Sequence, residues 1–276
     1  MDKGTLYIVS TPIGNLSDIT YRAVKTLTEA DAIAAEDTRH TLKLLSSLNI
    51  KNRLISFHEH SHAKKAQAVI NLLLEGKSIA LVTDAGTPLI SDPGAPLIAL
   101  AHENNIPVTA VPGACAAVTA LSLSGISCER FVFEGFLPRD SSRRGALARV
   151  SAYECTCIIY ESPHRLAATL SELLLACGDR RISVCKELTK LHECVERTTL
   201  AAAAEKYGAM ESVKGEYVLV LEGVKKELAE VSDSEIMSLL EKHISSGQSG
   251  KSAVKLVSEE LSLPKNRVYQ IMLGMK

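Results

Sequence analysis

Short β-branched segments alternate with helix-length amphipathic segments through most of the sequence, from residue 5 to residue 224. The first five predicted strands are separated by predicted helices, which is the pattern of a mainly parallel sheet covered by helices. Beyond residue 130 the predicted strands are longer, and more of them follow one another without helices. The sequence therefore predicts two α/β domains: residues 1–124 with a mainly parallel sheet, and residues 125–224 with a mixed sheet.

Hydrophobic periodicity and turn residues assign ten strands and seven helices in this region. The predicted strands are 6–10, 32–35, 54–57, 79–83, 108–111, 130–133, 157–161, 181–185, 194–200 and 216–221. The predicted helices are 21–29, 42–48, 63–75, 96–104, 116–124, 165–177 and 201–207.

The sequence after Gly223 changes character, and we predict a third, helical part at residues 225–276. Residues 225–233 are polar and charged, as in a linker, and three helical patterns follow them. Pro264 opens the third pattern at its first turn, and the short join before it is compatible with a helix-turn-helix. The pattern alone fits a small capping bundle and a nucleic-acid-binding module equally well.

Charge is distributed unevenly along the chain. Lys and Arg number 31 against 32 Asp and Glu, and this net charge of -1 argues against a protein that coats nucleic acid with its whole surface. Residues 242–276 nevertheless carry six lysines and arginines against two glutamates, so this segment has a net charge of +4 and the rest has -5. A basic helical face is typical of phosphate binding, and the candidates here are Lys251, Lys255, Lys265 and Arg267.

Other features exclude several classes of protein. Aromatic residues make up 4% of the chain and tryptophan is absent, so a surface that stacks several bases is not expected. No apolar run reaches the roughly 18 residues of a membrane span, and the N-terminus has no signal-peptide pattern, so we expect a cytoplasmic protein. The seven cysteines form no Cys-x-x-Cys pair, and His58 and His60 have no obvious third ligand, so no metal site is expected.

Three loops that follow predicted strands have the composition of a small-molecule site. They are Thr11–Asn15, the Gly/Pro/Asp-rich segment 84–94, and Pro112–Ala116 with its small residues at a helix start. Open α/β sheets bind ligands at the carboxyl ends of their strands, although neither a Gly-x-Gly-x-x-Gly motif nor a Walker sequence is present. In the second loop, Ser91 or Asp92 is expected to cap the following helix.

Six motifs occur in a fixed order along the chain. They are Thr11-Pro-Ile-Gly-Asn-Leu-x-Asp18, Ala35-Glu-Asp-Thr-Arg39, Asp84-Ala-Gly-Thr-Pro-x-Ile-Ser-Asp-Pro-Gly94, Val111-Pro-Gly-Ala114, Phe133-x-Gly-Phe-x-Pro-Arg139 and Glu161-Ser-Pro-His-Arg165. Together they resemble the S-adenosylmethionine-dependent 16S ribosomal RNA (cytidine-2′-O)-methyltransferases of the tetrapyrrole methylase superfamily. This resemblance covers nearly the whole chain. It implies a two-domain α/β fold plus a small helical domain, a homodimer, and a cytidine 2′-hydroxyl in the small ribosomal subunit as acceptor.

The resemblance also implies that S-adenosylmethionine is held between the two α/β domains, largely by backbone contacts. The residues carried over by position are Pro12, Asp84, Ala85, Gly86, Thr87, Leu89, Pro112, Gly113, Ala114, Cys115, Ala116, Tyr160, Glu161, Gly215, Glu216 and Tyr217. Cys115 departs from the family pattern, because superfamily relatives often have Ser or Thr there, so their hydroxyl contact is lost in this chain. The C-terminal helices are implied to help hold RNA.

Methyl transfer from a sulfonium is an in-line displacement, in which the enzyme mainly aligns the reactants and excludes water. The ribose hydroxyl must also lose its proton, so a carboxylate or imidazole at a strand end could act as general base. The candidates are Glu36, Asp37, His58 and Glu59. Each of them could equally be a helix cap or a member of a structural ion pair.

Arginines supply the remaining candidates for RNA contacts. We expect Arg39 and Arg165 to hold phosphates beside the target nucleotide. Arg139, Arg143 and Arg144 are expected to form a second basic patch that contacts RNA, although they could also belong to a solvated loop before a helix.

Two other interpretations remain open. A tetrapyrrole methylase that acts on a carbon of a porphyrinoid precursor would share the fold and the donor, but would need neither the basic C-terminal helices nor the arginine patch. A non-catalytic RNA-binding relative would keep the fold, but would have no use for intact donor loops. Donor binding separates an enzyme from the second alternative.

Overall fold

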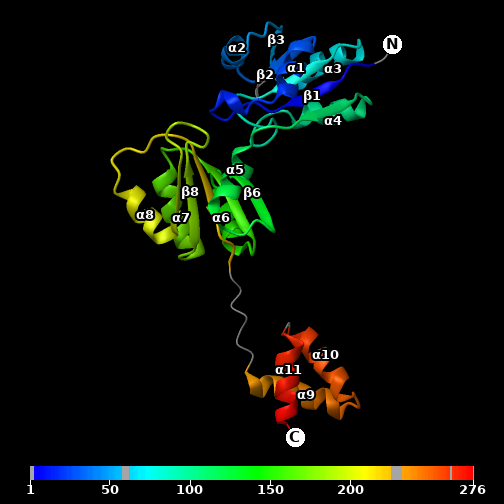
Figure 1. Cartoon of the computed structure of the whole chain (residues 1–276), viewed down its shortest axis with the longest axis vertical. Coiled ribbons are helices and arrows are strands. Elements are labelled where there is room, and N and C mark those ends of the chain that lie inside the picture. The colour runs from blue at the N-terminus through cyan, green and yellow to red at the C-terminus, as the bar shows by residue number, and fades with distance from the viewer. Residues whose placement is uncertain (1–2, 58–61, 225–231, 262, 276) are drawn as a thin grey trace. The chain divides into compact units, whose positions relative to one another are not determined.

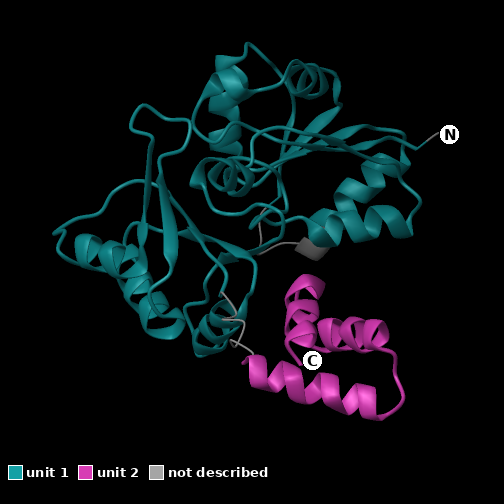
Figure 2. Cartoon of the chain, turned by 60° about the horizontal axis from the view of Figure 1, so that its bottom comes forward, with its two compact units in different colours: residues 1–224 teal, residues 225–276 magenta. Residues whose placement is uncertain are grey.

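The computed structural model describes residues 3–57, 62–224, 232–261 and 263–275. The chain forms two compact units, residues 1–224 and residues 225–276 (Figure 1 and Figure 2). The first unit contains two β-sheets with their helices, and the second contains three helices. This agrees with the predicted α/β architecture followed by a helical tail.

The first sheet consists of five short parallel strands. They are β1 (Leu6–Val9), β2 (Ala32–Ala35), β3 (Leu54–Ser56), β4 (Ile79–Val82) and β5 (Val108–Val111). Their order across the sheet is β3-β2-β4-β1-β5, and every neighbouring pair runs parallel. All five lie within one residue of the predicted ranges, so the predicted parallel sheet is confirmed.

Helices cover both faces of this sheet. They are α1 (Tyr21–Glu29), α2 (Thr38–Ser47), α3 (His62–Leu74) and α4 (Ala95–Glu103), with a short 3-10 helix η1 (Leu16–Asp18) after the first strand. Successive strand side chains point to opposite faces. Leu6 and Ile8 therefore join an apolar cluster with α3 and α4, whereas Val9 joins a second cluster with α1 and α2. Burial on both faces is typical of parallel sheets.

The second sheet is mixed, as predicted. Its strands are β6 (Phe131–Phe136), β7 (Thr156–Glu161), β8 (Arg181–Lys186), β9 (Cys194–Thr199) and β10 (Tyr217–Leu221), in the order β6-β7-β10-β8-β9. The β6–β7 pair is parallel, and the other three pairs are antiparallel. Its helices are α5 (Ala116–Ser124), α6 (Arg143–Ala152), α7 (Leu166–Cys177) and α8 (Leu200–Gly208).

Helix α6 was not predicted from the sequence. Only two of its side chains, Ala146 and Val150, are fully buried, and they are one small residue and one β-branched residue at a spacing of four. Gly145 and three arginines surround them, so the apolar periodicity is too short to identify a helix. The helix is held in place by the core of the second sheet, into which Ala146 and Val150 pack.

Helix α5 connects the two sheets. It directly follows β5 of the first sheet, but Ala117, Ala120 and Leu121 pack in an apolar cluster with strands of the second sheet. Ile13, from the loop after β1, joins the same cluster. The division of the first unit after residue 124 stays a prediction, and the packing associates α5 with the second sheet.

The second unit is a three-helix bundle with its own core. Its helices are α9 (Asp233–Ser245), α10 (Gly250–Glu260) and α11 (Lys265–Gly274). Side chains from all three, including Leu240, Val257 and Val268, form one buried cluster. Ser232 and Ser249 cap the first two helices through their hydroxyls. Among the described residues of the whole chain, no helix is long and apolar enough to cross a membrane.

Candidate active site

The loops that follow β1, β4 and β5 are joined by hydrogen bonds. Thr11 and Gly86 form a backbone bridge, with N–H to carbonyl distances of 2.9 and 3.1 Å. The Thr87 hydroxyl donates to the Ala114 carbonyl at 3.0 Å, and the Ser10 hydroxyl lies 3.0 Å from the same Thr87 oxygen. The three loops singled out in the sequence are therefore tied into one floor at the carboxyl edge of the sheet.

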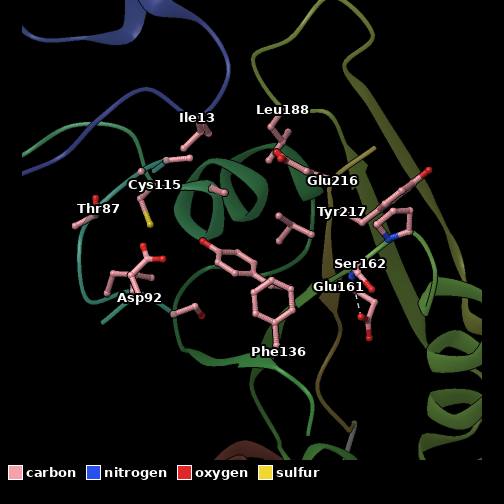
Figure 3. Close-up of a pocket in the computed structure, with 18 residues that line it drawn as sticks. Ile13, Thr87, Asp92, Cys115, Phe136, Glu161, Ser162, Leu188, Glu216 and Tyr217 are labelled. Carbon is pink, nitrogen blue, oxygen red and sulfur yellow. Dashed lines mark hydrogen bonds between the residues drawn. The ribbon is translucent and has the colours of Figure 1, made fainter. Parts of the chain in front are cut away.

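A cavity of about 340 Å³ lies above this floor, between the first and the second sheet (Figure 3). Its volume is at the lower end of the range for small-molecule sites, roughly 300–1,000 Å³. Nine of the sixteen predicted donor-binding residues line it: Ala85, Gly86, Thr87, Cys115, Ala116, Tyr160, Glu161, Glu216 and Tyr217. Figure 3 shows Asp92 and Cys115 on one side of the cavity and Glu216 and Tyr217 on the other.

The other seven predicted residues, Pro12, Asp84, Leu89, Pro112, Gly113, Ala114 and Gly215, do not line the cavity. Several of them shape its floor instead. A side chain at Gly113 would lie 2.9 Å from the Ser10 Cβ, and the Ala114 carbonyl accepts from Thr87. Asp84 accepts the N–H of Asp37 at 3.2 Å, which joins the ends of β4 and β2.

Sequence reasoning missed half of the lining residues. They are Ile13, Ile90, Ser91, Asp92, Phe136, Ser162, Pro163, Leu188 and Val218. Most of them stand inside the motifs that carried the resemblance, so the signal was present. What the sequence did not reveal was which motif positions turn their side chains inward.

Neither Ser91 nor Asp92 caps α4, although one of them was predicted to. The N-cap of α4 is Gly94, with a φ of 138°, and no side chain caps the helix. The Asp92 carboxyl lines the cavity instead. The pKa of Asp92 is raised to about 6, mainly by burial. A hydrogen bond with Thr83 lowers this pKa, whereas the nearby charges of Glu36 and Asp84 raise it. The cavity therefore contains a carboxyl group that ionises close to neutral pH.

Tyr160 and Glu161 close the cavity from the end of β7. The Tyr160 hydroxyl accepts the N–H of Ala117 at 3.0 Å, and burial raises the pKa of this phenol. The Ala117 N–H, at the start of α5, is thus already bonded within the protein. The buried Glu161 carboxylate accepts from the Thr169 hydroxyl at 2.6 Å and from the Ser162 N–H at 2.8 Å, so it is fixed by the start of α7.

Two of the predicted phosphate-binding arginines are engaged inside the protein. The Arg165 side chain is 20% exposed, lies 3.3 Å from Glu161, and donates to the Leu137 carbonyl at 2.7 Å. The Arg143 side chain is 17% exposed and binds Glu172, with further bonds to the Thr169 hydroxyl and the Pro138 carbonyl. These contacts assign both side chains a structural role.

The other predicted RNA-binding cations lie on the surface. Arg139 and Arg144 are exposed beside α6, and Arg39 is exposed at the start of α2, where it pairs with Asp37 at 3.3 Å. In the second unit, Lys251, Lys255, Lys265 and Arg267 are exposed on α10 and α11. Arg267 lies 3.4 Å from Asp233, and Lys255 lies 4.0 Å from Glu259.

The candidates for general base divide into three kinds. Asp37 caps α2 by accepting the Arg39 N–H at 2.8 Å, and hydrogen bonds from Arg39 lower its pKa. Glu36, at the end of β2, accepts the Thr83 hydroxyl at 3.3 Å. His58 and Glu59 lie outside the described residues. Among the residues that are described, no group of three or more His, Cys, Asp or Glu side chains could hold a metal ion.

The sequence matches known proteins over its whole length. Residues 5–204 match the family of Tetrapyrrole (Corrin/Porphyrin) Methylases, and the chain belongs to this family of S-adenosylmethionine-dependent methyltransferases. It is 47% identical to the Ribosomal RNA small subunit methyltransferase I of Halalkalibacterium halodurans, covering 98% of this chain and 95% of that protein. It is 44% identical to the protein of the same name from Synechocystis sp., covering 99% of both.

Solved structures share the fold at much lower identity. The crystal structure of diphthine synthase superposes with a TM-score of 0.62 at 13% identity, covering 79% of this chain and 89% of that one. Uroporphyrin-III C-methyl transferase from Thermus thermophilus, complexed with S-adenyl homocysteine, gives a TM-score of 0.57 at 17% identity, covering 79% and 96%. These likenesses confirm the predicted tetrapyrrole-methylase-like fold.

Proposed function

We propose that the protein transfers the methyl group of S-adenosylmethionine to the ribose 2′-hydroxyl of a cytidine in small-subunit ribosomal RNA. The observation that carries this proposal is the match to ribosomal RNA small subunit methyltransferases at 44–47% identity. It extends over 98–99% of the chain, so it includes the basic helical unit as well as the cavity. The cytidine and its 2′-hydroxyl are inferred from the six sequence motifs.

The cavity is where we place the donor. Its floor is made of backbone and small side chains, and its size suits one small molecule. The Asp92 carboxylate faces into it, and a cationic sulfonium donor would favour the ionised form of this group. The residues Gly86, Cys115 and Tyr217 line the same space. Donor binding and Asp92 ionisation are therefore expected to be linked.

The protein's own part in the transfer is alignment and removal of one proton. Among the described candidates, Glu36 is the one we assign as proton acceptor, because its charge acts on cavity-lining Asp92 and it lies at the carboxyl edge of the sheet. Asp37 is less suited, since its lowered pKa makes it a weaker base and it already caps α2. Glu36→Gln should reduce kcat much more than Asp37→Asn.

RNA contacts are assigned to the exposed cations. Arg139 and Arg144 are expected to hold phosphates near the first unit, and Lys251, Lys255 and Lys265 are expected to do so from the second. Arg143 and Arg165 are withdrawn from this role because their guanidinium groups are bound internally. We expect a protein with a substrate in the small ribosomal subunit to act in the cytoplasm.

We also propose that the protein is a homodimer. This proposal rests on the family resemblance of the six motifs. Tyr21, Leu175 and Leu191 are the most exposed large apolar side chains of the described residues, at 97%, 88% and 94%, so they are the positions at which to test a contact between copies. The mass in solution, measured by light scattering for the wild type and for Leu191→Glu and Tyr21→Glu, tests this. A monomeric wild type would refute the proposal.

The decisive experiment for the activity is a methylation assay with radiolabelled S-adenosylmethionine. Small ribosomal subunits from a strain that lacks the enzyme serve as substrate, beside naked ribosomal RNA, and mass mapping identifies the modified nucleotide. We expect one methyl group on the ribose of a single cytidine. Transfer to a base carbon or nitrogen, or no transfer to either substrate, would overturn the proposal.

A further inference from the structure

Strand β6 carries an irregularity beside the cavity. Its residues pair with β7 as Phe133 with Ile158 and Gly135 with Ile159, so Glu134 is an extra residue, a β-bulge. Gly135 has a φ of 66°, and a Cβ there would lie 2.9 Å from the Ser91 hydroxyl oxygen. Bulges beside active sites commonly redirect a side chain. Here the residue that follows the bulge is Phe136, which lines the cavity.

The bulge is anchored by side chains of the second sheet's helical layer. The Glu134 carboxylate is 10% exposed and accepts hydrogen bonds from the Tyr153 hydroxyl and from Arg149, the latter at 3.3 Å. The extra residue of the bulge is therefore held by its side-chain contacts, and the bulge determines on which face of β6 Phe136 lies.

Phe136 is placed as an open aromatic surface. Its ring meets the ring of Tyr160 edge to face, with centroids 5.6 Å apart, and the centroids of Phe133 and Tyr160 lie 4.9 Å apart. Tyr160 is itself fixed by its bond to Ala117. Phe136 nevertheless stays 53% exposed. The Phe136 ring is thus in contact with Tyr160, and about half of the residue's surface remains accessible.

The size of the cavity determines what can meet this ring. At about 340 Å³ the cavity has the size of a site for one small ligand, and we place the donor in it. The acceptor nucleotide then approaches the donor from the open side of the cavity. An exposed ring among the lining residues is the surface that the base of this nucleotide would meet.

We propose, on the basis of the proposed function, that Phe136 is the stacking platform for the base of the acceptor nucleotide. An unpaired pyrimidine stacked on this ring has its ribose turned toward the donor, so Phe136 is a substrate-positioning residue. Stacking on an aromatic ring requires no particular base, so this contact fixes orientation and the identity of the base is read elsewhere. The expectation of little base stacking is refined to one base on one ring.

Turnover on small ribosomal subunits tests the proposal. Phe136→Ala should lower kcat/KM for the subunit by about 5- to 150-fold, the range that base–aromatic stacking energies imply. Phe136→Tyr and Phe136→Trp keep a ring and should retain most of the activity, whereas Phe136→Leu should resemble Phe136→Ala. Phe131→Ala is the matched control, because Phe131 is 45% exposed on the same strand but does not line the cavity.

Donor binding provides the second measurement. The dissociation constant of S-adenosylhomocysteine, from calorimetry, should rise much less in Phe136→Ala than kcat/KM for the subunit falls. The chain contains no tryptophan, so Phe136→Trp also introduces a single indole at the cavity. A cytidine-containing single-stranded RNA added to the donor-saturated variant should change this fluorescence further, and should change that of Phe131→Trp much less.

Several results would overturn the inference. Wild-type kcat/KM in Phe136→Ala, or full activity in Phe136→Leu, would show that no ring is needed. A loss of donor affinity in Phe136→Ala as large as its loss of kcat/KM, or no response of donor-saturated Phe136→Trp to the RNA, would show that the ring serves the donor. If Phe136→Ala does not fold, the comparison of Leu with Trp still decides. A wild type that binds donor but methylates no subunit would instead refute the proposed function.

Discussion

Replacing Asp92 with asparagine tests how the cavity holds its ligand. In the donor-free protein the pKa of Asp92 is raised to about 6, so the carboxylate is mostly ionised at pH 7 and about nine-tenths protonated at pH 5. If only the ionised form binds the cationic donor well, affinity should fall about tenfold between pH 7 and pH 5. At pH 7, Asp92→Asn should weaken binding by roughly ten- to a hundredfold, the value of one charge-assisted hydrogen bond.

The same substitution should have the opposite effect on stability. The pKa of folded Asp92 lies above its ordinary value of 3.8, so this group costs stability at pH values above about 6 and costs none below 3.8. Asp92→Asn removes that cost, together with the repulsion from Glu36 and Asp84. The donor-free variant should therefore unfold at a higher temperature than the wild type at pH 7, and the difference should vanish at low pH.

Calorimetric titration with S-adenosylmethionine from pH 5 to pH 7, paired with thermal unfolding, measures both effects. Asp140→Asn is the control, because Asp140 is exposed, lies outside the cavity, and has its pKa lowered by Ser142. This control should keep the wild-type dependence on pH. Equal pH dependence in Asp92→Asn and the wild type would refute the reasoning, because the slope would then belong to another group.

Three further substitutions and one deletion have definite expected outcomes. Arg143→Ala should lower the free energy of unfolding by about 2 kcal/mol through loss of its bond to Glu172. Arg144→Ala should leave thermal unfolding unchanged and weaken subunit binding. A larger loss of stability in Arg144→Ala than in Arg143→Ala would be inconsistent with the burial of the two side chains. Gly86→Ala should cost about 1–2 kcal/mol of stability because its φ is 86°, and should weaken donor binding measured by calorimetry; unchanged affinity would mean that the loop adapts. Deleting residues 225–276 should preserve donor affinity and reduce the salt dependence of RNA binding, and an unchanged salt slope would remove the second unit from the RNA contact.

The sequence was most informative where local patterns are strong. The strands of the first sheet were located to within one residue, because continuous apolar runs end in glycine, proline or polar residues. The loop at residues 84–94, part of which lines the cavity, was singled out through its motif, but the start of the helix after it was misjudged. The N-cap is Gly94, with a φ of 138° and no side-chain cap, so neither Ser91 nor Asp92 occupies that position.

Predictions that depended on distant partners were the least successful. Arg143 was expected to contact RNA because its neighbours in sequence are basic, yet its charge is matched by Glu172, 29 residues away. Phe136 was part of a quoted motif, but its place in the cavity lining follows from the three-dimensional structure, in which a bulge at Glu134 shifts the register of β6. Such contacts are set by how β6, α6 and α7 pack together, which no local pattern encodes.

The packing of α5 has a mechanical consequence. Because this helix belongs to the core of the second sheet while the strand before it belongs to the first, the covalent connection between the two sheets is the short segment Pro112–Cys115. Cys115, at its end, lines the cavity. A ligand in that cavity therefore contacts the end of the segment that connects the two sheets. A change in the angle between the sheets would alter the surface that the ligand contacts. Occupancy of the cavity and the relative orientation of the two sheets should thus behave as one coupled variable.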